Sequence, residues 1–383
     1  MYVRRLKLTN WRNFREVDIP LQEVTYLVGA NAAGKSNLLD VFRFLRDVCK
    51  PDGGGLQAAI KDRQGFQKLR CLHARKVSHV GIEVELAESS ADGEPDWRYL
   101  LAFAAEGKGA QRTVVKEEKV WRKGELLLDR PGDDDRQDND RLLQTHLQQV
   151  QANQPFRDIA GFFAETVYLH VVPQLLKFGD QIGGQRLEND PFGQGLLETI
   201  ARVPERVRKA RLDRINKAFQ KAIPSVRDLR FVRDIISGRP HLEARYEHYR
   251  PNAGWQREEQ FSDGTLRLIG LLWSLSETGS ILLLEEPELS LNEKIVEQIP
   301  RMIASIRRDS RRRRQILLST HSAALLNNKA FEPKDILILT AGKEGSTIRS
   351  PNEDETEEME AGLSAADAVL RKIRMEVGGL EAA

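Results

Sequence analysis

The chain lacks an uninterrupted apolar run of about 18 residues, the length that a membrane-spanning helix needs, and it has only two cysteines, Cys49 and Cys71. Nothing in it therefore predicts a contact with a membrane, and its start shows no signal-peptide pattern. Two cysteines without metal-ligand spacing exclude a disulfide framework. We expect both to be packing residues of a cytoplasmic protein in a reducing compartment.

An excess of one charge is also absent, because 59 lysines and arginines stand against 57 aspartates and glutamates. The whole molecule is therefore no polycation, and any contact with nucleic acid must come from local patches. No sustained heptad pattern predicts a long coiled coil. The 383 residues, 40 % of them hydrophobic, are enough for one large domain or two smaller ones.

A phosphate-binding loop is present near the N-terminus, where residues 29–36 read GANAAGKS. This is a complete G-x-x-x-x-G-K-[ST] pattern between an apolar strand at 24–28 and a helical stretch at 37–48. Backbone N–H groups of such a loop point at phosphates, the lysine reaches the β- and γ-phosphates, and the serine hydroxyl binds Mg²⁺. The pattern predicts a site for ATP or GTP at Gly29, Asn31, Gly34, Lys35, Ser36 and Asn37.

A pair of acids follows a second apolar strand, since residues 281–288 read ILLLEEPE. Four consecutive apolar residues are typical of a buried parallel strand, and ligands of such sheets sit at the carboxyl ends of the strands. We expect Glu285 to hold the Mg²⁺ shell and Glu286 to polarise the attacking water as a general base. Together with the loop, the acids predict ATP hydrolysis.

Three further motifs complete a resemblance to ABC-type ATPases. Residues 261–265, FSDGT, resemble their signature motif, with Ser262 and Gly264 matching and Phe261 departing from the usual leucine. The same residues also read as a plain helix cap before the apolar stretch 266–275. Residues 316–322, ILLSTHS, resemble the strand that ends in the switch histidine, here His321, and 289–292 resemble the D-loop.

The opening of the chain narrows the resemblance to the SMC/RecF/OLD branch, over roughly residues 1–345. Residues 3–14, VRRLKLTNWRNF, look like the first strand and turn of that branch, and the text around Glu285 and His321 is similar to its stand-alone AAA-21-type members. The resemblance implies that Arg12 lies beside the nucleotide phosphates, although an arginine in a turn is often simply exposed. It also offers Gln174 as the Q-loop ligand of Mg²⁺, against an ordinary loop glutamine.

The predicted fold is an α/β P-loop NTPase of ABC-ATPase type, with a mixed central sheet, an antiparallel β meander and a compact helical insertion. We expect lobe I at 1–130, a mostly helical insertion at 131–224, lobe II at 225–350 and an acidic tail with a short helix at 351–383. Within these, 130–140 is predicted to be a polar loop, the acids of 352–360 a solvated stretch, and 364–375 the short helix. The tail leaves no room for a Toprim nuclease domain.

Two basic stretches of the sequence can each be interpreted in two ways, and both interpretations stay open. Residues 202–217 and 307–314 are rich in arginine and lysine. Each is either a solvated surface, with arginines favourably placed near a helix C-terminus, or a patch that contacts nucleic-acid phosphates. Neither has the interleaved aromatic residues of single-strand readers.

The resemblance implies an ATP- and Mg²⁺-dependent ATPase in which two protomers close head to tail and seal each other's nucleotide. The first hypothesis for its output is control of a separate, co-encoded nuclease or toxin in prokaryotic anti-phage defence or DNA maintenance. The second is a RecF-like repair ATPase that binds DNA itself. The third, the nucleotide-binding subunit of a membrane transporter, is disfavoured by the Asn-Trp-Arg start at Asn10.

Overall fold

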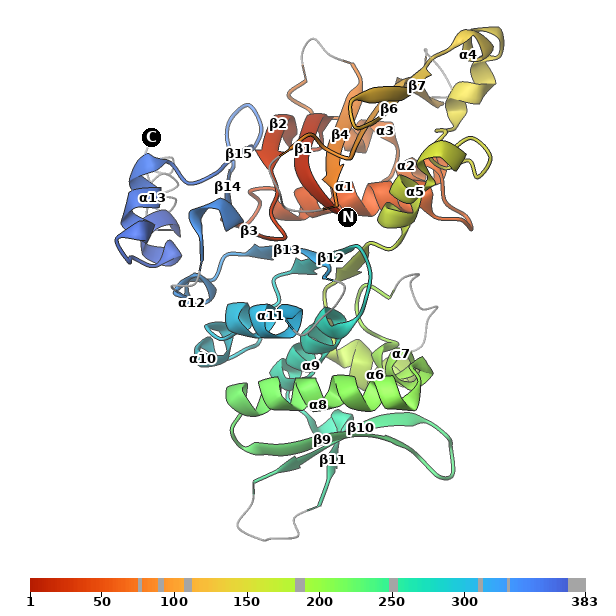
Figure 1. The fold of residues 1–383 in the computed structure, drawn as a ribbon. Helices are drawn as coiled ribbons and strands as arrows, with labels where there is room; N and C mark the ends of the chain where they lie inside the picture. The colour runs from red at the N-terminus through yellow and green to blue at the C-terminus, as the bar shows by residue number, and fades with distance from the viewer. Residues whose placement is uncertain are drawn as a thin grey trace.

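In the computed structural model, a mixed sheet holds the middle of the molecule (Figure 1). The structure describes residues 1–74, 78–88, 93–106, 112–182, 190–247, 254–308, 313–328 and 331–370. Within these ranges the sheet runs, in spatial order, through β15 (Thr347–Arg349), β14 (Ile336–Thr340), β3 (Val24–Gly29), β13 (Gln315–Thr320), β12 (Ile281–Glu285) and β8 (Val167–Leu169). All are parallel except β15, so the carboxyl ends of β3, β8, β12 and β13 meet at one edge.

The parallel strands have mostly apolar, buried residues because both faces of this sheet are covered. On one face, Leu27, Leu283 and Leu317 join a buried cluster beneath α1 (Lys35–Cys49). On the other face, the alternate residues Leu282 and Leu318 join a second buried cluster. Successive strand side chains point to opposite faces, so a continuous apolar run is what a strand between two cores requires.

The first core is closed by an antiparallel sheet that packs over α1 at the top of Figure 1. Its order is β2 (Phe14–Pro20), β1 (Tyr2–Trp11), β4 (Val80–Ala87), β5 (Trp97–Ala105), β6 (Thr113–Arg122) and β7 (Glu125–Arg130). This confirms the predicted meander in lobe I. Both cysteines are buried and unbridged, as expected.

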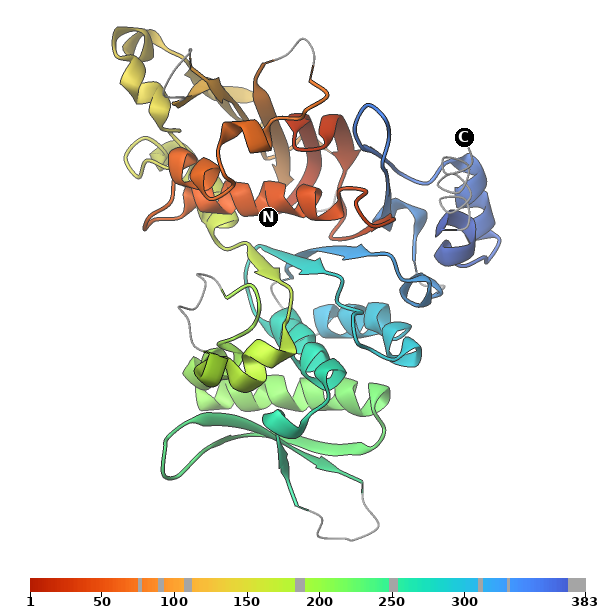
Figure 2. The ribbon, with the colours of Figure 1, turned by 180° about the vertical axis from the view of Figure 1, so that it is seen from behind.

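The second core lies below the mixed sheet, where α9 (Asp263–Ser276), α11 (Ile299–Arg308) and α8 (Glu205–Ala222) pack. A three-stranded antiparallel sheet of β9 (Val226–Arg233), β10 (Pro240–Tyr246) and β11 (Gln256–Arg257) covers α8 from outside. Figure 2 shows α6 (Pro173–Ile182) and α7 (Leu196–Arg202) beside α8 on the other side of the molecule. The sequence analysis did not foresee this small sheet.

Short elements connect these layers. Around lobe I they are α2 (Leu56–Lys61), α3 (Phe66–Leu69), α4 (Asp133–Gln137), η1 (Asn139–Leu143), η2 (Gln154–Phe156) and α5 (Arg157–Ala164). In the second half they are η3 (Glu258–Gln260), α10 (Glu293–Val296), α12 (Ala323–Leu326), η4 (Pro333–Asp335), α13 (Glu353–Glu360) and the π-helical turn η5 (Ala366–Leu370). No helix of the described residues has both the length and the apolar character that a bilayer crossing demands.

The structure corrects three expectations. The acids of 352–360 are mostly exposed, as expected, but they form helix α13, which Asn352 caps, and Glu355 is fully buried and binds Arg349. The polar segment 130–140 contains α4, held by Asp135. The range 131–224 also supplies β8 to the central sheet, and of the predicted helix at 364–375 only η5 falls within the described residues.

Candidate functional site

The phosphate loop joins β3 to α1 at the carboxyl edge of the central sheet. Lys35 lies folded into the loop, where its ammonium donates to the carbonyls of Gly29 (2.8 Å) and Ala30 (2.9 Å). Gly34 adopts φ 102° and a Cβ there would lie 2.2 Å from Asn13 Nδ2, so only glycine fits this position. Burial lowers the pKa of Lys35, against the opposing charges of three glutamates that follow β12.

Ser36 of the phosphate loop and Glu285, the first acid of the pair after the apolar strand, are in direct contact. Ser36, the second residue of α1, donates its hydroxyl to Glu285 Oε1, at the end of β12. These two residues come from positions 249 apart and meet because β3 and β12 both flank β13 in the sheet. The structure therefore brings together two of the three residues predicted to hold Mg²⁺, Ser36 and Glu285.

Tyr168 is a member of this site that the sequence analysis missed. It is the middle residue of β8, the neighbour of β12, and donates its hydroxyl to Glu285 Oε2. Burial and this hydrogen bond raise the pKa of Tyr168, so the phenol remains a donor at neutral pH. The guanidinium of Arg43 lies 4.3 Å from the centre of the Tyr168 ring and packs the ring in place. His170, two residues on, has Nδ1 3.2 Å from the Glu285 carbonyl.

Glu286 and His321 face each other across the next pair of strands. His321 Nδ1 lies 3.0 Å from Glu286 Oε1. Glu286 has φ 42°, and its N–H donates to the Ser319 carbonyl of β13 (3.1 Å). A glutamate held in this left-handed backbone conformation is uncommon and costs about 1–3 kcal/mol. The surrounding sheet fixes the carboxylate beside His321 in spite of that cost.

Glu288 is a buried acid that holds the chain at Thr320 and His321 in place. It is 6 % exposed, and its Oε1 accepts from the Thr320 hydroxyl (2.6 Å) and from the His321 N–H (3.4 Å). Burial raises the pKa of Glu288, and these hydrogen bonds oppose the rise. The pattern ILLLEEPE showed a third acid, but nothing in the sequence indicated that it would be buried under the histidine.

The residues resembling the ABC signature begin a helix, as predicted. Ser262 caps α9 by accepting from the Thr265 N–H (3.1 Å). Gly264 packs so closely on the D-loop residues that an added Cβ would lie 2.6 Å from the carbonyl oxygen of Ser290. Asn292 of the same loop caps α10. Signature and D-loop therefore form one contiguous surface on this chain.

Gln174 contacts the start of α9 in this structure and makes no described contact with Glu285. Its amide donates to Asp263 Oδ2 (2.7 Å), the first residue of α9, and Lys177 binds the other oxygen of that carboxylate (3.0 Å). Among the described contacts, Gln174 therefore links α6 to the start of the signature helix. A role in the Mg²⁺ shell would require it to leave Asp263, and it stays a prediction.

Arg12 lies on the flank of α1. Its guanidinium donates twice to Asp40 Oδ2 (2.9 and 2.6 Å), and Arg63 binds the same carboxylate. Burial alone would raise the pKa of Asp40, but the charges and hydrogen bonds of Arg63, together with the charge of Arg12, outweigh it and lower the pKa. Asn37 donates to Asn13 (2.7 Å), while Asn31 is exposed at the loop tip.

The residues present fit a magnesium ion. Mg²⁺ prefers hard oxygen ligands and is commonly held by one or two carboxylates or hydroxyls together with the phosphates of a nucleotide. The Ser36 hydroxyl and the Glu285 carboxylate supply such oxygens in mutual contact. The donor set therefore matches the ion that the sequence predicted.

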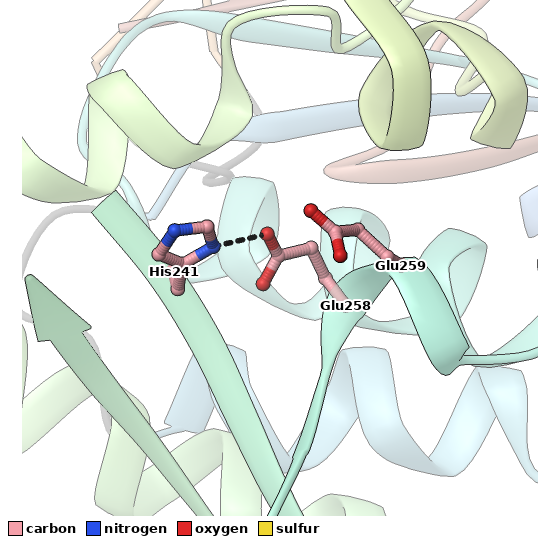
Figure 3. A group of neighbouring side chains, drawn as sticks. All are labelled: His241, Glu258 and Glu259. Atoms are coloured by element: carbon pink, nitrogen blue, oxygen red, sulfur yellow. Dashed lines mark hydrogen bonds and ion pairs between the residues drawn. The ribbon is translucent and has the colours of Figure 1, made fainter. Parts of the chain in front are cut away.

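A second group of possible metal ligands lies in the small sheet. His241, Glu258 and Glu259 are the group of this kind that the described residues contain (Figure 3). His241 Nδ1 lies 2.8 Å from Glu258 Oε1, and the Leu242 N–H donates to Oε2 (2.9 Å). Both oxygens of Glu258 already have protein partners, so the group clamps η3 to β10 just before the signature motif.

The geometry defines a class. A mixed parallel sheet, an antiparallel sheet across α1, a phosphate loop and an acid pair at the carboxyl edge make this an ABC-type P-loop ATPase of the SMC/RecF branch. The chain belongs to the family described as AAA domain, putative AbiEii toxin, Type IV TA system, whose model matches residues 24–327. Nucleotide binding is a property of this P-loop family.

Curated relatives match a smaller part of the chain. The DNA replication and repair protein RecF of Roseiflexus castenholzii is 35 % identical over 92 residues, 22 % of this chain and 23 % of that protein. RecF of Synechocystis sp. is 31 % identical over 90 residues, 23 % of each chain. The match thus spans about a quarter of the length of these relatives.

Solved structures match nearly the whole chain. The SMC head bound to the C-winged helix domain of ScpA aligns with a TM-score of 0.56 and 16 % identity, covering 93 % of this chain and 99 % of that one. The Pyrococcus furiosus Smc head with an extended coiled coil, bound to the C-terminal domain of ScpA, gives 0.51 and 14 %, covering 94 % and 98 %. At these identities the likeness establishes the fold, and it confirms the predicted fold class.

Proposed function

We propose that this protein is an ATP-hydrolysing switch that dimerises on ATP and controls a separate effector protein. The observation that carries the proposal is the cluster at the carboxyl edge of the sheet, where Ser36 meets Glu285 and Glu286 faces His321. Membership of the ATPase family supports it. The family description names a toxin system, which favours an effector in defence or DNA maintenance over a metabolic role.

The loop and the two acids divide the chemistry among them. When ATP binds, Lys35 exchanges the carbonyls of Gly29 and Ala30 for phosphate oxygens, which is a gain because a charge–charge contact replaces a charge–dipole one. Ser36 and Glu285 would hold Mg²⁺, which neutralises charge developing on the phosphates. Glu286 accepts a proton from the attacking water, and His321 orients that carboxylate.

Closure of a second protomer completes the site. Ser262 is exposed and caps α9, and Gly264 lies in the first turn of that helix. A helix N-terminus carries partial positive charge and binds phosphate well. We infer that this helix N-terminus contacts the nucleotide of the partner protomer, so that the affinity of two shared nucleotides drives the closed state.

The substitution Glu286→Gln tests the switch. The amide cannot take the proton from water, so turnover should fall by about 10²–10⁴-fold, while ATP binding at Lys35 persists. The variant should therefore accumulate as an ATP-bound dimer, measured by light scattering with and without ATP and Mg²⁺. Lys35→Ala is the control and should stay monomeric. A Glu286→Gln protein that hydrolyses ATP normally, or stays monomeric with ATP bound, would refute the mechanism.

A RecF-like ATPase that binds DNA itself is the second candidate, favoured by the 35 % identity to RecF over 92 residues. Measuring the mass of the protein purified with its co-encoded neighbour, with and without ATP, distinguishes the effector proposal from the RecF-like one. A stable complex that responds to ATP supports the effector, whereas a lone dimer that gains affinity for duplex DNA on adding ATP supports the RecF-like reading.

A further inference from the structure

The two basic stretches of the sequence line one groove in the tertiary structure. The groove lies between α8 and α11, below the central sheet, and encloses about 850 Å³. From α8 come Arg214, Lys217 and Lys221, from α11 come Arg301 and Arg308, and Arg313 lies two residues before β13. Two stretches that are far apart in the chain therefore line the same groove.

The base of the groove is apolar. Its apolar lining includes Val24 and Tyr26 of β3, Pro300 and Ile303 of α11, and Phe331. Tyr26 is 5 % exposed and packs edge-on against Phe331, with ring centres 4.6 Å apart. Tyr26 is therefore too buried to offer an open ring face to a nucleic-acid base.

Positive charge exceeds negative charge around this base. Two acids line the groove, Glu23 and Asp335. Glu23 accepts from Arg307 (2.5 Å) and lies 4.0 Å from Arg313. Lys217 and Lys221 point along the same rim and are exposed. The groove therefore combines an apolar floor with a positively charged rim.

We propose that this groove binds an acidic, amphipathic segment of a partner protein. Such a segment places apolar side chains on the floor and carboxylates against the rim, a recurring mode of helix recognition. A cavity of this volume takes a few side chains, about the size of a drug-like ligand. A DNA duplex would meet the rim alone and leave the apolar floor unmatched.

The groove is connected to the catalytic site through β3. Val24 and Tyr26 belong to the strand that ends at Gly29 and leads into the phosphate loop. The inference rests on the proposed function for the identity of the partner as the controlled effector. The binding surface itself is testable without nucleotide, so the two can fail separately.

Fluorescence anisotropy on the full chain, without nucleotide, tests the surface. The probe is a fluorescein-labelled peptide of repeated Glu-Glu-Leu-Leu units, compared with repeated Glu-Glu-Ser-Ser units and with a labelled DNA duplex. The variant Lys217→Glu/Lys221→Glu reverses the rim. The matched control, Arg206→Glu/Lys209→Glu, makes the same change of charge on α8 outside the groove. Circular dichroism checks that both remain folded.

The Glu-Glu-Leu-Leu peptide should bind, and the rim variant should weaken it about tenfold or more, as expected for loss of electrostatic complementarity. The control variant and the basal ATPase rate should stay near wild type. Absent peptide binding, equal binding of the serine peptide, or equal losses in both variants would overturn the proposal. A DNA affinity that only the rim variant loses would replace the protein partner with nucleic acid.

Discussion

At the scale of single residues, one phenol orients Glu285, the proposed magnesium ligand. Tyr168 donates to Glu285 Oε2 while Ser36 donates to Oε1, so both carboxylate oxygens have fixed partners. Groups that orient a metal ligand without touching the metal commonly change affinity or activity by about 10–100-fold. Tyr168 is in this sense a positioning residue.

The substitution Tyr168→Phe removes that hydroxyl and little else. We expect the Mg²⁺ concentration for half-maximal ATPase activity to rise, with activity at limiting Mg²⁺ falling about 10–100-fold. Nucleotide binding without Mg²⁺ serves as the control and should be unchanged, because Lys35 is not involved. An unaltered Mg²⁺ dependence would show that the contact with Glu285 is incidental.

At the scale of elements, a buried ion pair fastens α4 to the antiparallel sheet. Arg130, at the end of β7, binds Asp135 of α4 (2.8 and 3.0 Å) and Glu118 of β6 (2.9 Å). All three side chains are buried. The hydrogen bonds from Arg130 lower the pKa of Asp135 from 3.8 to about 2.

This lowered pKa gives the stability a defined pH dependence. Because the folded pKa lies below the unfolded one, the contribution of Asp135 is complete above about pH 4 and is lost as the pH falls toward 2. Asp135→Asn should lower the unfolding free energy at pH 7 by about 2–3 kcal/mol, the cost of losing charge-assisted hydrogen bonds, because Arg130 keeps Glu118 as a charged partner. Denaturant unfolding at pH 7 and pH 3 measures this, and the gap to wild type should narrow at pH 3.

Asp133→Asn is the matched control for this experiment. Asp133 lies on the same short helix, but its side chain is 87 % exposed and its partner Arg136 is exposed as well. Exposed ion pairs contribute about 0–1 kcal/mol, so little change is expected at either pH. Equal losses in both variants would mean that the general charge of α4, rather than the buried pair, stabilises the sheet.

At the scale of the whole molecule, the proposed mechanism requires a second copy of the chain to complete the site. The surface that would meet the partner's nucleotide is built from the signature helix and the D-loop, which touch at Gly264 and Ser290. Since backbone faces backbone there, neither side can yield to a larger residue. The precise shape of this surface then decides whether two protomers close.

Gly264→Ala tests that requirement. The new methyl would lie 2.6 Å from the Ser290 carbonyl and push the D-loop away. ATP binding should persist, whereas ATP-dependent dimerisation and ATPase activity should fall at least about tenfold. Nucleotide titration and light scattering separate the two effects. Gly161→Ala is the control, because a methyl on that helical glycine of α5 meets nothing within 4 Å. Normal dimerisation of Gly264→Ala would contradict a head-to-tail sandwich.

Local chemistry in the sequence determined the loop, the acid pair and the fold class. The order of glycines, lysine and serine in residues 29–36 is characteristic of phosphate-binding loops. Buried parallel strands can be found in a sequence because they are runs of apolar residues. Glu285 and Glu286 were placed by following such a run to its end. In the same way, Ser262 was recognised as a cap because capping depends on neighbours three residues away.

Only the tertiary structure decided which distant groups meet. Tyr168 reaches Glu285 because β8 pairs with β12, a pairing that a three-residue strand does not reveal by itself. Gln174 binds Asp263, and Glu355 is buried by Arg349, because packing chooses one partner among several polar neighbours. The two basic stretches became one groove when α8 and α11 packed beneath the same sheet. Sequence patterns report local periodicity, whereas such meetings depend on how whole layers stack.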